Sequence, residues 1–135
     1  MWLFDTNVLS EVIRKRPDPG LIKRLREVAP ADCLSSVICR YELRYGAFLR
    51  EDGPVFWSKL EMQILPLVRW IAMDSAVSDR AGAMAATLER EGKQIGLHDV
   101  LIAATAIEYD LTLVTRNTRH FARLAGLRVE NWFAD

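Results

Sequence analysis

Short apolar runs alternate with amphipathic segments along this chain. Apolar runs at about residues 2–5, 33–35, 67–73 and 111–115 predict β-strands, and residues 127–129 predict a further edge strand. The intervening segments carry apolar side chains every three or four positions, as helices with one buried face do. Strands that alternate with helices in this way favour an α/β domain with a mainly parallel central sheet.

The boundaries of the predicted helices follow from capping residues and turns. Thr6 or Asn7 supplies a capping oxygen after the first strand, and Ser36 does so after the second. Asp74 is interpreted as a cap before the helix that contains Val77. The predicted helices cover about residues 6–16, 21–28, 36–49, 54–65, 77–88 and 99–109, with a short one from 118.

Side chains that carry oxygen stand at several junctions between these elements. Asp5 ends the first strand, and Asn117 follows the strand at 111–115. Asp99 opens an almost wholly apolar helix, and Glu42 interrupts the apolar face of another. Ligands of open parallel sheets bind beyond the carboxyl ends of the strands, and such oxygens suit Mg²⁺. The four residues therefore predict metal-assisted hydrolysis of a phosphodiester.

Glu42 is the hardest of these residues to explain by local structure. Its helical neighbours are all apolar, which predicts that its carboxylate is turned inward; they are Ile38, Tyr41, Tyr45 and Leu49. A buried carboxylate needs a raised pKa, an arginine partner or a metal ion. A structural ion pair with a distant arginine therefore remains an alternative, and Tyr41 and Tyr45 are predicted to be core residues.

The other candidates also have structural explanations. Asp99 suits a helix N-terminus for its charge alone, and Asn117 is a good helix cap. Capping explains Asp5 less well, because Thr6 and Asn7 already offer oxygens. The two histidines, His98 and His120, are expected to face solvent or to form hydrogen bonds.

Composition narrows the class of protein. The chain has 135 residues, half of them apolar, which predicts one domain over residues 1–135. Its net charge is zero, so any binding of nucleic acid must depend on a local basic patch. Arg116, Arg119 and Arg123 are the candidates for such a patch. We find neither a membrane-spanning apolar run nor a signal peptide. With Cys33 and Cys39 interpreted as buried reduced thiols, a cytoplasmic protein is expected.

Together the motifs resemble a known family. The resemblance covers essentially the whole chain and is to PIN domains, more narrowly to VapC-type toxins, including the FitB-like branch. It is carried, in order, by Leu3-Phe4-Asp5-Thr6-Asn7-Val8-Leu9-Ser10, Ser36…Glu42-Leu43…Gly46, Asp99…Ile102-Ala103-Ala104…Ala106 and Val114-Thr115-Arg116-Asn117…Phe121.

This resemblance implies both a fold and a function. The expected fold is a three-layer α/β/α PIN-like domain. The expected activity is that of an Mg²⁺- or Mn²⁺-dependent endoribonuclease, the toxin of a type II toxin–antitoxin pair. The expected partners are RNA, a VapB-type antitoxin, operator DNA through that antitoxin, and a second copy of the chain. Phe56, Trp57 and the helices around 21–28 and 54–65 are candidate dimer surface.

The resemblance also assigns roles to residues. Asp5, Glu42 and Asp99 match the acidic metal ligands of the family, and Asn117 matches a fourth catalytic position that is often Asp. Thr6 or Thr115 matches a hydroxyl that orders a carboxylate or water. His120 stands where the family often has an acid, so that the site has less negative charge. We therefore expect one bound metal rather than two.

Three other functions remain open at this point. Asp5 would be the nucleophile of an aspartyl phosphatase or phosphotransferase, although such enzymes usually need a second Asp where Asn7 stands. Asp74 would be the phosphate acceptor of a receiver-like signalling module. A catalytically silent PIN-like domain that binds RNA or protein is the third alternative.

Overall fold

Five parallel strands form the centre of the molecule. The computed structural model describes residues 1–134, and its sheet has the order β3-β2-β1-β4-β5. All four neighbouring pairs are parallel, which confirms the predicted α/β class. The strands are β1 (Trp2–Phe4), β2 (Cys33–Ser36), β3 (Arg69–Ile71), β4 (Thr112–Val114) and β5 (Val129–Glu130).

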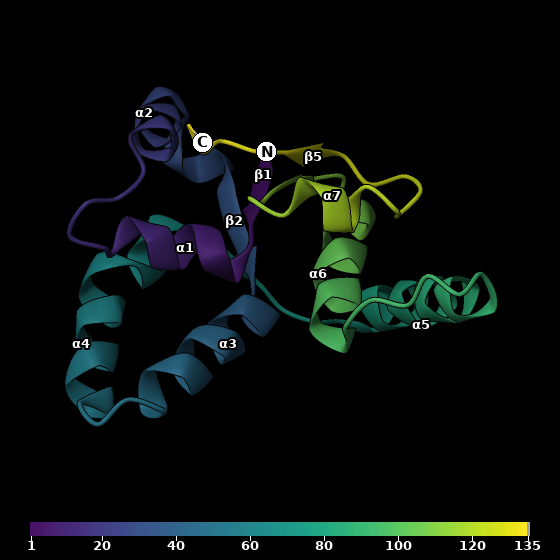
Figure 1. Cartoon of the computed structure of the whole chain (residues 1–135), viewed down its shortest axis with the longest axis horizontal. Helices are drawn as coiled ribbons and strands as arrows, with labels where there is room; N and C mark the ends of the chain where they lie inside the picture. Colours follow the sequence, from purple (N-terminus) through teal and green to yellow (C-terminus); the bar gives the residue numbers. More distant parts are fainter. Residues whose placement is uncertain (135) are drawn as a thin grey trace.

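Helices cover both faces of this sheet, so the three-layer arrangement is confirmed. In Figure 1, α1, α2 and α4 lie on one side of the strands and α5, α6 and α7 on the other. The helices are α1 (Thr6–Val12), α2 (Pro19–Glu27), α3 (Val37–Phe48), α4 (Gly53–Gln63), α5 (Ser75–Arg90), α6 (Leu97–Glu108) and α7 (Thr118–Phe121). The predicted strand at 67–73 is shorter than expected, because a 3-10 turn, Leu65–Leu67, precedes it.

Successive side chains of β1 and β4 point to opposite faces of the sheet and pack into two separate hydrophobic cores. Leu3 and Leu113 pack under α5 and α6, whereas Phe4 and Val114 pack on the opposite face, toward α1, α2 and α4. All four side chains are buried, as expected for strands that are covered on both faces. Cys33 and Cys39 are buried free thiols, as predicted. No helix within residues 1–134 has the length and apolar character that crossing a bilayer requires.

The order in which strands are added to the sheet changes sides at β1. β2 is added on one side of β1 and β4 on the other, which leaves a crevice beyond their carboxyl ends. The register aligns Phe4 with Val114, and the amide of Asp5 donates to the carbonyl of Val114 at 3.2 Å. The residues that follow these two strands, Asp5 and Thr115, therefore lie side by side.

Candidate active site

Asp5 is a buried carboxylate with two hydrogen-bond donors. It is 6% exposed; its Oδ1 accepts from the amide of Val8 at 3.0 Å, and its Oδ2 accepts from the Thr115 hydroxyl. Asp5 thus caps α1 itself, and the expectation that Thr6 or Asn7 would do so was wrong. The reason is that Asp5 keeps an extended backbone directly before the first helical turn.

The surroundings of Asp5 act on its pKa in opposite directions. Burial raises the pKa above its ordinary value, while the hydrogen bonds from Thr115 and Val8 lower it. The negative charges of Asp99 and Glu42 raise it further. Both of these carboxylates therefore lie close enough for their charges to act on Asp5, and a cation bound beside Asp5 would relieve that repulsion.

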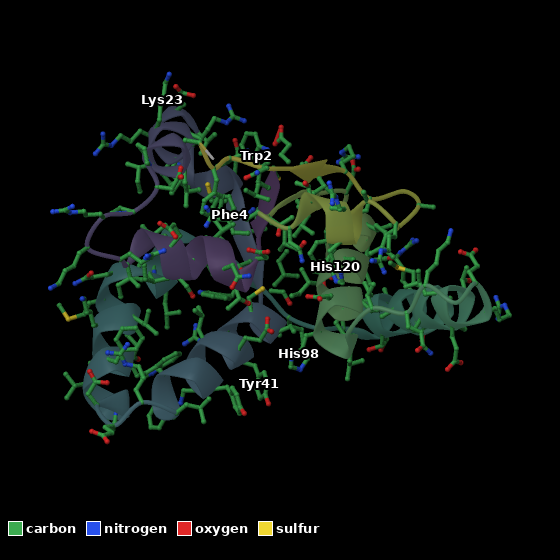
Figure 2. The ribbon with its side chains drawn as sticks, viewed as in Figure 1. Trp2, Phe4, Lys23, Tyr41, His98 and His120 are labelled. Carbon is green, nitrogen blue, oxygen red and sulfur yellow. The ribbon has the colours of Figure 1, made fainter. Side chains whose placement is uncertain are left out.

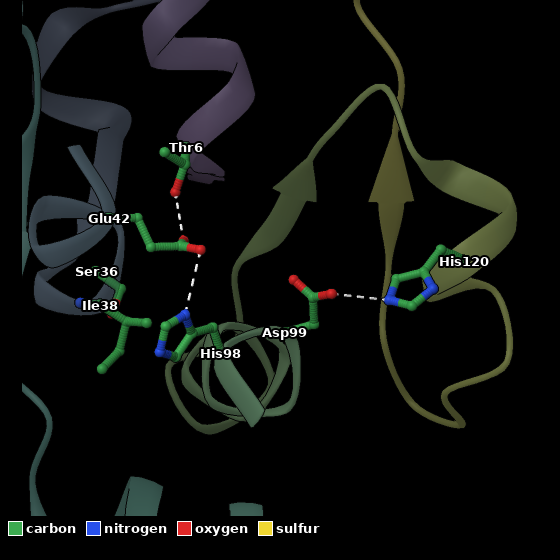
Figure 3. A network of polar contacts seen from close by, with 7 residues as sticks. All are labelled: Thr6, Ser36, Ile38, Glu42, His98, Asp99 and His120. Atoms are coloured by element: carbon green, nitrogen blue, oxygen red, sulfur yellow. Dashed lines mark hydrogen bonds and ion pairs between the residues drawn. The ribbon is translucent and has the colours of Figure 1, made fainter. Parts of the chain in front are cut away.

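Glu42 is held on α3 by two side chains from other elements. The Thr6 hydroxyl donates to its Oε1 at 2.6 Å, and His98 Nδ1 lies 3.3 Å from its Oε2 (Figure 3). The carboxylate is half-buried, with 29% of the side chain exposed. Its neighbours are therefore a hydroxyl and an imidazole. Within residues 1–134, this hydroxyl and imidazole take the place of the alternative that was left open, a distant arginine partner.

The tyrosines beside Glu42 point outward, contrary to the predicted core role. Tyr41 and Tyr45 are 54% and 57% exposed and stack on each other with their ring centroids 6.1 Å apart. Figure 2 shows Tyr41 next to His98, and the two rings meet edge to face. On α3 the buried positions are instead Cys39, Leu43 and Ala47. Glu42 therefore sits at the margin of the apolar stripe, at the surface of the cleft.

Asp99 lies in the first turn of α6, which begins two residues earlier than predicted. Its Oδ2 is 2.9 Å from Nε2 of His120, on α7 (Figure 3). The helix N-terminus favours this negative charge. The N-cap position belongs to Gly96, so capping does not account for Asp99.

Within residues 1–134, the side chain of Asn117 makes no hydrogen bond to Asp5, Glu42 or Asp99. It is exposed, and its backbone amide donates to the Thr115 hydroxyl oxygen at 3.0 Å. It occupies the N-cap position of α7, but its side chain makes no capping hydrogen bond. His120 is hydrogen-bonded, as expected, and its partner is Asp99, which the sequence did not identify. The available signal was the position of His120 one helical turn after Asn117, at the place where the family often has an acid.

Two depressions meet at Glu42. The larger, of about 680 Å³, extends along α1, α3 and α4 and has a basic rim formed by Arg14, Arg50, Lys59 and Arg116. The smaller, of about 310 Å³, is lined by Glu42 and the segment 96–99. Of the predicted arginine cluster, Arg116 lines the larger cleft, whereas Arg119 and Arg123 are exposed at α7 and after it.

The donor set suits a hard divalent cation. Its carboxylate oxygens are the ligands that Mg²⁺ prefers, and Asp5 is buried with two negative neighbours. Within residues 1–134, no three acidic, histidine or cysteine side chains already enclose a metal position. The reason is visible in Figure 3, where Glu42 and Asp99 turn to different histidines on either side of the first turn of α6. The residues fit a metal ion by chemistry and charge.

Comparisons with known proteins agree with this geometry. The PIN domain family model matches residues 2–127. The toxin FitB of Neisseria gonorrhoeae is 36% identical over 90% of this chain and 91% of its own length. Ribonuclease VapC2 of Haemophilus influenzae is 34% identical over 97% of both chains.

A solved structure extends the similarity to three dimensions. The crystal structure of VapBC2 from Rickettsia felis, bound to a DNA fragment from its promoter, superposes with a TM-score of 0.88. The two chains are 31% identical, and the match covers 97% of this chain and 98% of that one. The chain therefore belongs to the PIN-domain family, within the group of VapC and FitB toxins.

Proposed function

We propose that this chain is the toxin of a type II toxin–antitoxin pair and acts as a metal-dependent endoribonuclease. The observation that carries the proposal is the surroundings of Asp5, the buried residue directly after β1. The negative charges of Glu42, on α3, and Asp99, on α6, both raise its pKa. The names of the relatives, a toxin and a ribonuclease, support the same activity.

Each residue has a distinct role in this proposal. Asp5, Glu42 and Asp99 hold Mg²⁺ or Mn²⁺, which when bound lowers the pKa of a water molecule and polarises the scissile phosphate. Thr115 and Thr6 orient Asp5 and Glu42 through their hydrogen bonds. Asn117, exposed at the end of β4, helps through a bridging water. The basic rim of the larger cleft binds phosphates of the RNA.

The proposed partners follow from the relatives. The Rickettsia felis structure is a VapBC2 complex bound to promoter DNA. We infer that this chain binds a cognate VapB-type antitoxin, and that the antitoxin makes the contacts with operator DNA. A homodimer in the cytoplasm is part of the same proposal. Phe56 and Trp57 are half-buried and pack against the core, so their part in a dimer surface stays a prediction.

Two of the rival functions fit the structure poorly. An aspartyl nucleophile must reach its substrate, but Asp5 is buried and both of its oxygens accept hydrogen bonds. Asp74, the acceptor of a receiver-like module, caps α5 beside the edge strand β3 and accepts a hydrogen bond from Tyr109. It lies away from the other acids.

The decisive experiment is RNA cleavage under metal control. Purified protein is incubated with labelled structured and single-stranded RNA in Mg²⁺, Mn²⁺ or EDTA, beside Asp99→Asn. We expect cleavage with metal only, and almost none by the variant. Asp79→Asn, an exposed acid on α5, is the matched control and should cleave normally.

The rivals predict other outcomes. Cleavage that persists in EDTA, or full activity in Asp99→Asn, would contradict the metal mechanism. A trapped phospho-aspartate would favour the phosphatase. Metal binding without cleavage of any RNA would favour a silent binding domain.

A further inference from the structure

His120, which stands where the family often has an acid, lies beside Asp99. The His120 side chain is 24% exposed, and its ring packs edge-on against Phe121, 5.1 Å away. Phe121 is buried in the core. The imidazole is therefore held over Asp99 from the side of α7, while Asn117 remains exposed.

The spacing of the two side chains is an ordinary hydrogen-bond distance, and it also allows both of them to bind one ion. Two ligands at right angles on an octahedral ion, with bonds of about 2.1 Å, lie about 3.0 Å apart. His120 Nε2 and Asp99 Oδ2 are separated by 2.9 Å. A divalent cation can therefore bind to both atoms without a change in their separation.

The other histidine is less suited to this role. Both oxygens of Glu42 already have partners, Thr6 and His98, whereas within residues 1–134 Asp99 is held through Oδ2 only. The His98 side chain is also more exposed, at 43%. His120, with 24% of its side chain exposed, is thus the better placed of the two histidines, beside a carboxylate that keeps one oxygen available for an ion.

We propose that His120 is a ligand of the catalytic metal together with Asp99, and that this nitrogen donor makes the site prefer Mn²⁺ to Mg²⁺. Imidazole suits the transition metals, whereas Mg²⁺ favours oxygen. An uncharged ligand in place of an acid also leaves less negative charge for a second ion. The inference rests on the proposed function only in taking Asp5, Glu42 and Asp99 as the metal-binding carboxylates.

The test is a direct measurement of nitrogen coordination. The full chain is labelled with ¹⁵N-histidine, loaded with Mn²⁺ and studied by electron spin echo envelope modulation. The chain has only two histidines, so His120→Gln and His98→Gln assign any coupling. We expect a ¹⁵N coupling in the wild type and in His98→Gln, and its loss in His120→Gln.

Several results would overturn the proposal. They are a wild-type protein that binds Mn²⁺ without a ¹⁵N coupling, a coupling that survives in His120→Gln, and one that disappears in His98→Gln. Gln retains a hydrogen-bond donor for Asp99. If His120 only positioned Asp99 by a hydrogen bond, His120→Gln would therefore bind Mn²⁺ as the wild type does.

Metal preference gives a second readout. We expect calorimetry to show Mn²⁺ binding at least about tenfold tighter than Mg²⁺. His120→Asp should reduce this ratio toward one by strengthening Mg²⁺ binding, and an unchanged ratio would contradict the proposal. Neither measurement uses RNA. A protein that shows the coupling but cuts no RNA overturns the proposed function alone, and one that cuts RNA without the coupling overturns this inference alone.

Discussion

At the scale of single residues, the site depends on carboxylates that the fold makes costly. Asp5 is buried beside two other acids, and only its hydrogen bonds with Val8 and Thr115 offset that cost. Functional sites commonly contain groups of this kind, because the same environment that destabilises the empty site favours binding of a cation.

The raised pKa of Asp5 predicts how stability changes with pH. Between the ordinary value of 3.8 and the raised pKa, the folded chain binds more protons than the unfolded chain does. The contribution of Asp5 to stability therefore falls as pH rises through this window and stays low above it.

Asp5→Asn should remove this dependence. In EDTA at neutral pH we expect a higher Tm than in the wild type, and activity reduced by more than the roughly 10–100-fold typical of a lost outer-shell partner. Thermal unfolding from pH 4 to 8 measures the first effect, and RNA cleavage the second. A variant that is less stable than the wild type at neutral pH would contradict the prediction.

The hydroxyl of Thr6 predicts a smaller functional effect. Thr6→Val keeps the shape of the side chain but loses the hydrogen bond to Glu42, so we expect a roughly 10–100-fold loss of metal affinity or activity. Thr6→Ser retains the hydroxyl and should stay close to the wild type. If the serine variant is as impaired as the valine variant, the methyl group matters and the hydrogen bond does not.

At the scale of elements, the start of α3 determines where Glu42 stands. Ser36 ends β2, and its hydroxyl oxygen accepts from the amide of Ile38 at 3.0 Å, as expected of a helix cap. The strand therefore passes directly into the helix, and Glu42 lies less than two turns further on.

Loss of this cap should destabilise the fold. Ser36→Ala is expected to lower the free energy of unfolding by about 1 kcal/mol, measured by urea denaturation. Ser36→Thr keeps a capping oxygen and is the control. Because Ser36 is also buried, an equal loss in both variants would indicate packing rather than capping.

At the scale of the whole molecule, charge is distributed unevenly although it sums to zero. The larger cleft has a basic rim, in which Arg14 is paired with Glu11, and Arg50 with Asp52. These pairs weaken the local field. Lys59 lines the same cleft on α4 and is exposed.

RNA affinity should therefore decrease with salt concentration, with a shallow slope because only a few basic side chains contact phosphates. The logarithm of the affinity, measured in EDTA by fluorescence anisotropy, should fall linearly with the logarithm of the salt concentration. Lys59→Gln should reduce the slope by about one, whereas Lys93→Gln, after α5, should leave it unchanged. Affinity that is independent of salt, or equal effects of the two variants, would contradict a local basic site.

The sequence by itself determined the class of the fold and identified the acids that are proposed as metal ligands. Periodicity predicted the strands and helices closely, and the caps Ser36 and Asp74 were correct, because both signals depend on neighbours within one turn. The same local signals placed Asp5, Glu42 and Asp99 at the ends and margins of elements.

Only the tertiary structure decided which side chains meet. Thr115 is one partner of Asp5, and His98 is one partner of Glu42. The residues of each pair are far apart in the chain and are brought together by strand order and helix packing. The packing of α3 leaves Tyr41 and Tyr45 exposed. An apolar face in the sequence does not show how much of that face the neighbouring elements bury. For the same reason no local signal identified Asp99 as the partner of His120. Contacts between distant segments depend on how rigid elements pack, and no local pattern encodes that.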